Sequence, residues 1–333
     1  MRPLQIHIVI LVSLVLMSNY IESKAEDYGQ YHKELTNARS LLFKGESKNA
    51  LNLYVKTLSG FPYAFPRDIV DGIKISCLVN DVGTIKNLIQ LGIQHALDTN
   101  FLWHIKELIP FIERYEIKKY TRENIKTWLQ VVDLQFNKKT YTRFMSYYLT
   151  ESKARQQYIA NGRKEEYYAS YEAIVRNNAQ KILRIFQDSN RFIGERTTSI
   201  NNPYLQGNLP PVFGEENYYS PNSLSASTVI LMHQDCLLLD FLPYMTKGLL
   251  CGELDPIDFA LIYEREIKDV AAGRCNTTLG CRYMAVWTGY NEGKYDSHFI
   301  DSCRQNIFLP KLSHLDSLWQ FQIRTGIMLC RDL

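Results

Sequence analysis

Apolar residues recur at helical spacing through the first third of the chain, most clearly in residues 29–64. Ala38 lies on the apolar face of a first helix, Gly45 ends that helix, and a second helix is predicted from about Ser47 to Leu58. The second helix carries a stripe at i, i+3, i+4 and i+8, formed by Ala50, Leu53, Tyr54 and Leu58. The pattern predicts a helical hairpin.

Two further hairpins are predicted before residue 136. Gly72 falls 34 residues after Ala38, and apolar faces flank the turn residues 80–83. A third helix pair is predicted within residues 101–135. Together these segments predict an array of α-α hairpins.

The first hairpin resembles a tetratricopeptide repeat. Five residues match that family's pattern of small residues, turn glycine, aromatic and proline: Ala38, Gly45, Ala50, Tyr54 and Pro62. The resemblance implies hairpins stacked as a short solenoid. A plain helical hairpin is the alternative.

The pattern changes from about Tyr141. A polar, tyrosine-rich helical region runs from Tyr141 to Phe186 with a break at 160–162, and residues 197–223 form a long polar loop. The most apolar helix is predicted from about Leu224 to Leu242. Asp255 and Pro256 then have the residue types of an N-cap and a first helical residue. The last 60 residues show no clear period, and a few short strands are the alternative to helix there.

These elements predict a mainly α protein in three segments. Residues 1–25 are a signal peptide, residues 26–138 are tetratricopeptide-like hairpins, and residues 139–333 are a helical C-terminal domain.

The N-terminal segment points to export. Arg2 precedes an apolar run from Ile8 to Met17, and Ser23-Lys24-Ala25 offers small residues at the cleavage positions. We therefore expect a secreted or periplasmic protein with no stable membrane span after cleavage. An uncleaved N-terminal anchor is the alternative.

Composition excludes some classes of protein. The chain of 333 residues is 46% hydrophobic and carries a net charge of +3, which cleavage after residue 25 lowers to +2. Positive residues do not cluster, so no nucleic-acid partner is expected. The sequence contains no glycine-rich phosphate loop, no serine elbow and no zinc-protease motif, and we expect no cofactor.

Seven cysteines follow the signal segment, so at least one thiol of an oxidised monomer has no partner in its own chain. Cys275 and Cys281 are close in a polar stretch and form a candidate disulfide, with two free thiols as the alternative. No close second pair completes a zinc site, so no metal is expected.

His233 is the sharpest candidate for chemistry, because it lies in the most apolar helix and needs a polar partner there. On a continuous helix His233, Cys236 and Asp240 share a face, and Glu264 and Arg265 of the next helix could meet it. These are candidate catalytic residues: His233, Glu264 and Arg265. Candidate binding residues are Glu195, Arg196 and Asp240. The structural alternative makes His233 a core histidine bonded to Glu264 or to backbone, Glu264 and Arg265 a salt bridge, and Cys236 a small buried hydrophobe.

Three segments resemble an uncharacterised helical domain family of secreted and periplasmic proteins, chiefly of Bacteroidetes-type bacteria. They are Phe192–Glu195, the helix around His233-Gln234-Asp235, and Gly252–Pro256 followed by Phe259–Arg265. The resemblance implies a helical fold and an exported location, but no reaction.

Two functions are open at this point. The first is a binding or scaffolding module whose hairpin array presents a concave surface to a protein or peptide. The second is a cell-envelope enzyme, for example a hydrolase, with its site around His233.

Overall fold

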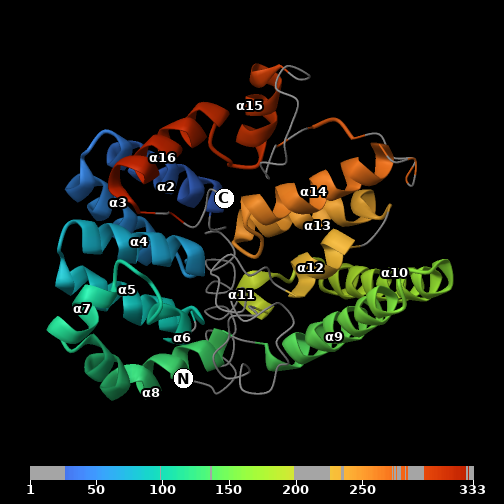
Figure 1. Ribbon diagram of the computed structural model, residues 1–333, viewed down its shortest axis with the longest axis horizontal. Coiled ribbons are helices and arrows are strands. Elements are labelled where there is room, and N and C mark those ends of the chain that lie inside the picture. Colours follow the sequence, from blue (N-terminus) through green and yellow to red (C-terminus); the bar gives the residue numbers. More distant parts are fainter. Residues whose placement is uncertain are drawn as a thin grey trace, which may run out of the picture.

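The computed structural model describes residues 27–97, 99–135, 137–198, 226–233, 236–271, 273, 275, 279–281, 283, 296–327 and 329. Every regular element in these ranges is a helix, which confirms the mainly α class (Figure 1). The strands considered for the last 60 residues are absent from the described part of that region. Within the same described ranges, no helix combines the length and apolar character needed to cross a membrane.

The first four helices form two packed hairpins. Helix α2 (Tyr28–Phe43) packs on α3 (Ser47–Gly60), and α4 (Pro66–Leu78) packs on α5 (Val82–Gln94), while α3 also contacts α4. Gly45, with φ of +86°, provides the left-handed turn between α2 and α3, a conformation that costs glycine little.

The third predicted pair differs from expectation in its first arm. Two short helices, α6 (Thr99–Leu102) and α7 (Ile109–Arg114), replace the predicted single helix, and α8 (Ile117–Gln135) packs on α5 and α7. Pro110 explains part of the break, because it has no N–H and fits only the first turn of α7.

The break predicted at 160–162 separates two long helices, α9 (Lys138–Ala160) and α10 (Glu165–Ser189). They pack as a hairpin that projects from the rest of the molecule (Figure 1). The short α11 (Glu195–Thr198) follows and packs against α9 and α12 (Ala226–His233).

The prediction of one continuous apolar helix from about Leu224 to Leu242 is wrong. Helix α12 ends at His233 and α13 (Leu238–Cys251) begins after a break in which Cys236 has a left-handed φ of +64°. Pro243 lies inside α13.

The remaining helices are α14 (Pro256–Ala271), α15 (Ser297–Asn306) and α16 (Leu312–Thr325). Asp255 caps α14, since its Oδ1 accepts the Ile257 N–H at 2.8 Å, with Pro256 as the first helical residue, as predicted.

The side chains form two apolar cores. One lies within α2–α8 and also contains Leu318 and Phe321 of α16, and the other joins α9, α10 and α12–α15. The last helix therefore returns to the first, and α16 packs on α2 (Figure 1). Both ends of the described chain thus contribute to the N-terminal core.

Candidate functional site

His233 ends α12, and its Nδ1 is hydrogen-bonded to a carboxylate oxygen of Glu151 on α9. The Glu151 side chain is 2% exposed and that of His233 is 27% exposed. A buried carboxylate thus holds an imidazole that solvent partly reaches.

The hydrogen bond determines what the imidazole can do. When Nδ1–H donates to Glu151, the other ring nitrogen, Nε2, is the basic atom. No residue in the described ranges is hydrogen-bonded to Nε2, and the second oxygen of Glu151 is buried without a hydrogen-bond partner there. The pair can therefore accept a proton at Nε2.

Sequence reasoning missed Glu151, although a signal was present. The buried stripe of α9 runs through Phe144, Tyr148 and Ala154, and Glu151 is the one charged residue within it. A carboxylate on an apolar face needs a partner, but nothing local says that the partner lies 82 residues further along the chain.

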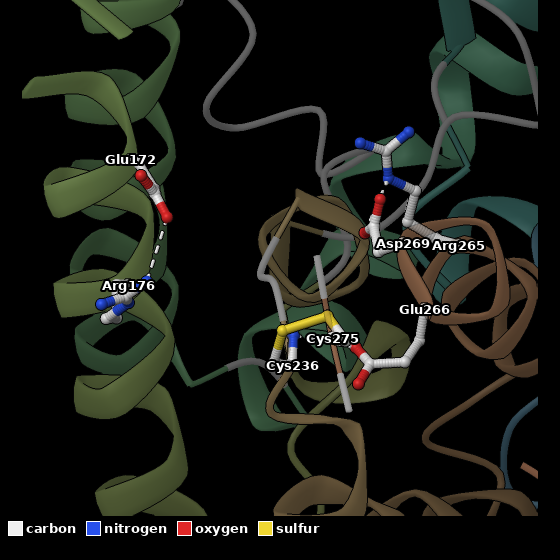
Figure 2. The surroundings of a disulfide bond; sticks show 7 residues. All are labelled: Glu172, Arg176, Cys236, Arg265, Glu266, Asp269 and Cys275. Carbon is white, nitrogen blue, oxygen red and sulfur yellow. Dashed lines mark hydrogen bonds and ion pairs between the residues drawn. A yellow bond between two sulfur atoms is a disulfide. The ribbon is translucent and has the colours of Figure 1, made fainter. Parts of the chain in front are cut away.

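The other predicted catalytic residues do not meet His233. Glu264 accepts the backbone N–H of Tyr283 at 3.0 Å, and Arg265 pairs with the buried Asp269 at 3.5 Å. Arg265 is 45% exposed, and its pair with Asp269 lies within α14 and does not tie two helices together (Figure 2). The prediction that Glu264 is the hydrogen-bond partner of His233 is therefore wrong.

Cys236 is neither a buried hydrophobe nor on a shared face with His233. It is exposed and forms a disulfide with Cys275, and its backbone N–H donates to Glu266 at 3.0 Å (Figure 2). The predicted Cys275–Cys281 pair is therefore wrong, because the break after α12 turns Cys236 toward the end of α14. The same break separates Asp240, an exposed residue in the first turn of α13, from the face of His233.

Glu195, a predicted binding residue, lies in a second group of polar side chains between the two cores. Arg67 of α4 is 3.1 Å from Asp258 and 3.6 Å from Asp255, both of which are buried. Burial raises the pKa of the nearby Glu195 to about 8; the charge of Arg67 opposes this rise, while Asp258 and Asp255 add to it.

The segment from Gly194 to Thr197, which contains Glu195, is fixed by Glu253, a residue between α13 and α14. Its carboxylate accepts the N–H groups of Gly194 and Thr197, at 3.0 and 3.2 Å, and the Thr197 hydroxyl at 2.8 Å. The Glu253 carbonyl accepts the N–H of Glu195 at 2.8 Å. A Cβ on residue 194 would lie 1.8 Å from that carbonyl, so only glycine fits there.

Arg196, the other predicted binding residue, faces the end of α5. Burial lowers the pKa of His95 to about 4, and the positive charge of Arg196 adds to this effect. His95 is thus neutral at physiological pH, and its Nδ1 accepts the N–H of Ala64 at 3.0 Å.

The polar group extends through α4 to α2. Arg39 lies 3.1 Å from Asp68 and 3.3 Å from Asp71, and the Tyr31 hydroxyl donates to Asp68 at 2.9 Å. We call the buried set Arg39, Asp68, Asp71, Arg67, Asp255, Asp258 and Glu195 the interhelix network. Each of its side chains is buried, and the contacts of Arg67 with Asp255 and Asp258 join α4 to the start of α14.

The described residues include no group of three or more His, Cys, Asp or Glu side chains able to hold a metal ion. A cavity of about 460 Å³ lies elsewhere, between α2 and the segment 305–311 that leads into α16. The His233–Glu151 pair, a partly exposed imidazole bonded to a buried carboxylate, is a candidate for acid–base chemistry.

Comparisons with protein families, curated proteins and solved structures give no match. Function has to be inferred from the geometry of the site.

Proposed function

We propose that this protein is an exported enzyme of the hydrolase type, in which His233 and Glu151 form the acid–base centre. The observation that carries the proposal is the hydrogen bond between Nδ1 of a partly exposed imidazole and a buried carboxylate. Export rests on the signal-peptide pattern of residues 1–25.

Glu151 and His233 have different roles in the proposed reaction. Glu151 accepts the Nδ1–H, which holds the ring in one tautomer and orients it. Nε2 then takes a proton from a water molecule as the water oxygen attacks an electrophilic carbonyl or phosphoryl group. The carboxylate of Glu151 stabilises the imidazolium so formed, which returns the proton to the leaving group. Proton transfer of this kind contributes about 10²–10⁴-fold to a rate.

The packing of the hairpins favours this function over binding through their inner face. Ten of the thirteen residues of α4 are buried, and its Arg67 is bonded to Asp258 of α14. Helices α13 and α16 of the same chain cover α2, where Gly252 packs against the ring of Tyr28. The chain itself therefore covers part of the surface of α2 and α4, which leaves less of these hairpins open to a peptide.

The test is a survey of hydrolysis on chromogenic carboxylic esters, phosphate esters, glycosides and peptide amides. His233→Gln and Glu151→Gln should each lower kcat by about 10²-fold or more on the class that wild type hydrolyses. His298→Ala, which changes an exposed histidine on α15, should leave the rate unchanged. Turnover that survives in His233→Gln would contradict the proposal.

A second measurement needs no substrate. Diethyl pyrocarbonate modifies a histidine at a free ring nitrogen, so His233 should be carbethoxylated in the folded protein and peptide mapping should locate the adduct. His95, which is 6% exposed, should be protected. Protection of His233 to the same degree as His95 would remove the accessibility that the proposal requires.

A further inference from the structure

Two more cysteines meet in the core of the C-terminal helices. Cys281 follows α14 and packs against the apolar core that contains Cys303 of α15, and the Cys303 thiol is near enough to help raise the pKa of the Cys281 thiol. Cys303 is 3% exposed and Cys281 is half-buried. Neither takes part in the Cys236–Cys275 disulfide.

The backbone on both sides of this thiol pair is held in place. The N–H of Cys281 donates to the hydroxyl of Tyr263 on α14 at 3.2 Å. Two residues later the carbonyl of Tyr283 accepts a guanidinium N–H of Arg304 at 2.7 Å, and Arg304 follows Cys303 directly. These bonds tie the segment that carries one thiol to the helix that carries the other.

Ring packing completes the surroundings. The rings of Tyr263 and Tyr283 are 5.0 Å apart at their centroids and meet edge to face, and Phe259 packs against both. All of these residues and both cysteines belong to the same apolar core or pack against it. The fold therefore brings the segment that carries Cys281 and the helix that carries Cys303 together in one apolar core.

We propose that Cys281 and Cys303 form a second disulfide bond, made by exchange with a thiol-oxidising disulfide outside the cytoplasm. The thiolate of Cys281 attacks the disulfide of the oxidant and releases one thiolate, which gives a mixed disulfide. The thiolate of Cys303 then attacks the Cys281 sulfur and releases the second thiolate. Two cysteine thiols lose two protons and two electrons, and one oxidant disulfide becomes two thiols.

Burial affects the rate of this exchange. It raises the pKa of the Cys281 thiol to about 11, and the neighbouring Cys303 thiol adds to the rise. The attacking thiolate is therefore scarce at neutral pH, so oxidation of the folded chain should be slow and should accelerate with pH. The inference does not depend on the His233–Glu151 site.

The experiment uses the full chain with all its thiols reduced, incubated with oxidised glutathione at pH 7 and pH 8. After an acid quench the protein is denatured, alkylated with N-ethylmaleimide and digested without reduction, and the peptides are identified by mass spectrometry. The expected map contains a Cys281–Cys303 crosslink beside Cys236–Cys275, and the new crosslink forms about ten times faster at pH 8.

Two variants give the controls. Cys303→Ser should stop at a mixed disulfide between Cys281 and glutathione, whereas Cys77→Ser should leave both crosslinks intact. The Cys236–Cys275 crosslink in the same sample reports that the chain has oxidised. Alkylation of both Cys281 and Cys303 in molecules that contain this crosslink would overturn the proposal, and so would a crosslink from Cys281 to any other cysteine.

Discussion

A guanidinium nitrogen of Arg67, near the start of α4, lies 3.1 Å from a carboxylate oxygen of Asp258, near the start of α14, and both side chains are buried. The two residues are 191 positions apart in the sequence. This contact joins the two apolar cores. The burial of both side chains determines how much stability the contact contributes. Asp255 is close to the same guanidinium, so the arginine neutralises part of a group of buried carboxylates.

Removing Arg67 should therefore destabilise the protein strongly. Arg67→Met leaves Asp255 and Asp258 buried without that positive charge, and breaking a buried pair in this way costs about 3–5 kcal/mol. The midpoint of urea unfolding, followed by circular dichroism, measures the change. Arg176→Met is the matched control, since its pair with Glu172 lies on the exposed face of α10 and such pairs contribute about 0–1 kcal/mol (Figure 2). Equal midpoints for the two variants would show that the interhelix network does not hold the cores together.

Glu195 should make stability fall as pH rises from about 4.5 to about 8. Its folded pKa of about 8 exceeds the ordinary value of 4.5, so between these values the folded chain keeps a proton that the unfolded chain has lost. Its contribution is fully present below pH 4.5 and is lost by about pH 8, at up to about 1.4 kcal/mol per pH unit. Glu195→Gln cannot ionise, so its free energy of unfolding should decline less between pH 6.5 and 8.5.

The pH range of that comparison, 6.5 to 8.5, lies above the range in which His95 changes the stability. The pKa of His95 is lowered to about 4, so the unfolded chain binds the extra proton between about pH 4 and 6.5, and this residue makes stability rise over that range. Denaturant titrations at pH 6.5, 7.5 and 8.5 isolate the effect of Glu195. Glu172→Gln, a change at the surface of α10, should keep the wild-type slope. A Glu195→Gln slope equal to that of wild type would mean that Glu195 is ionised throughout.

Replacing His233 separates its structural role from a catalytic one. His233→Ala leaves the buried Glu151 without its partner and should cost about 1–3 kcal/mol. His233→Gln can still donate to Glu151 and should cost less. If His233 is catalytic, His233→Gln should melt close to wild type and yet have lost activity. Thermal unfolding of the two variants, read beside the hydrolysis survey, distinguishes these roles, and equal melting temperatures for His233→Ala and wild type would exclude the structural one.

The mature protein should begin near Glu26. The charged start, apolar run and small residues of 1–25 are the order of a cleaved signal segment. N-terminal sequencing of protein from separated cell fractions should find Glu26 as the first residue outside the cytoplasm. An intact Met1 in cytosolic material would contradict both cleavage and export.

The sequence by itself determined the helices whose signals are local. The hairpins α2–α3 and α4–α5, the break between α9 and α10 and the Asp255 cap of α14 follow from spacing and capping within a few residues of each position. The sequence also predicted that His233 has a polar partner, because burying an imidazole in an apolar helix without a hydrogen bond costs free energy.

Only the tertiary structure decided which groups meet. Glu151 was not a candidate because its partner lies on a helix far along the chain, and Cys236 pairs with Cys275 because α12 and α13 are separate helices. In the same way Arg67 and Asp258 look like ordinary surface charges, and Glu195 looks like a binding residue, until α4, α11 and α14 pack together. Periodicity records which face of a helix is buried, but the partner of that face depends on the free energy of packing over the whole chain, which no local pattern contains.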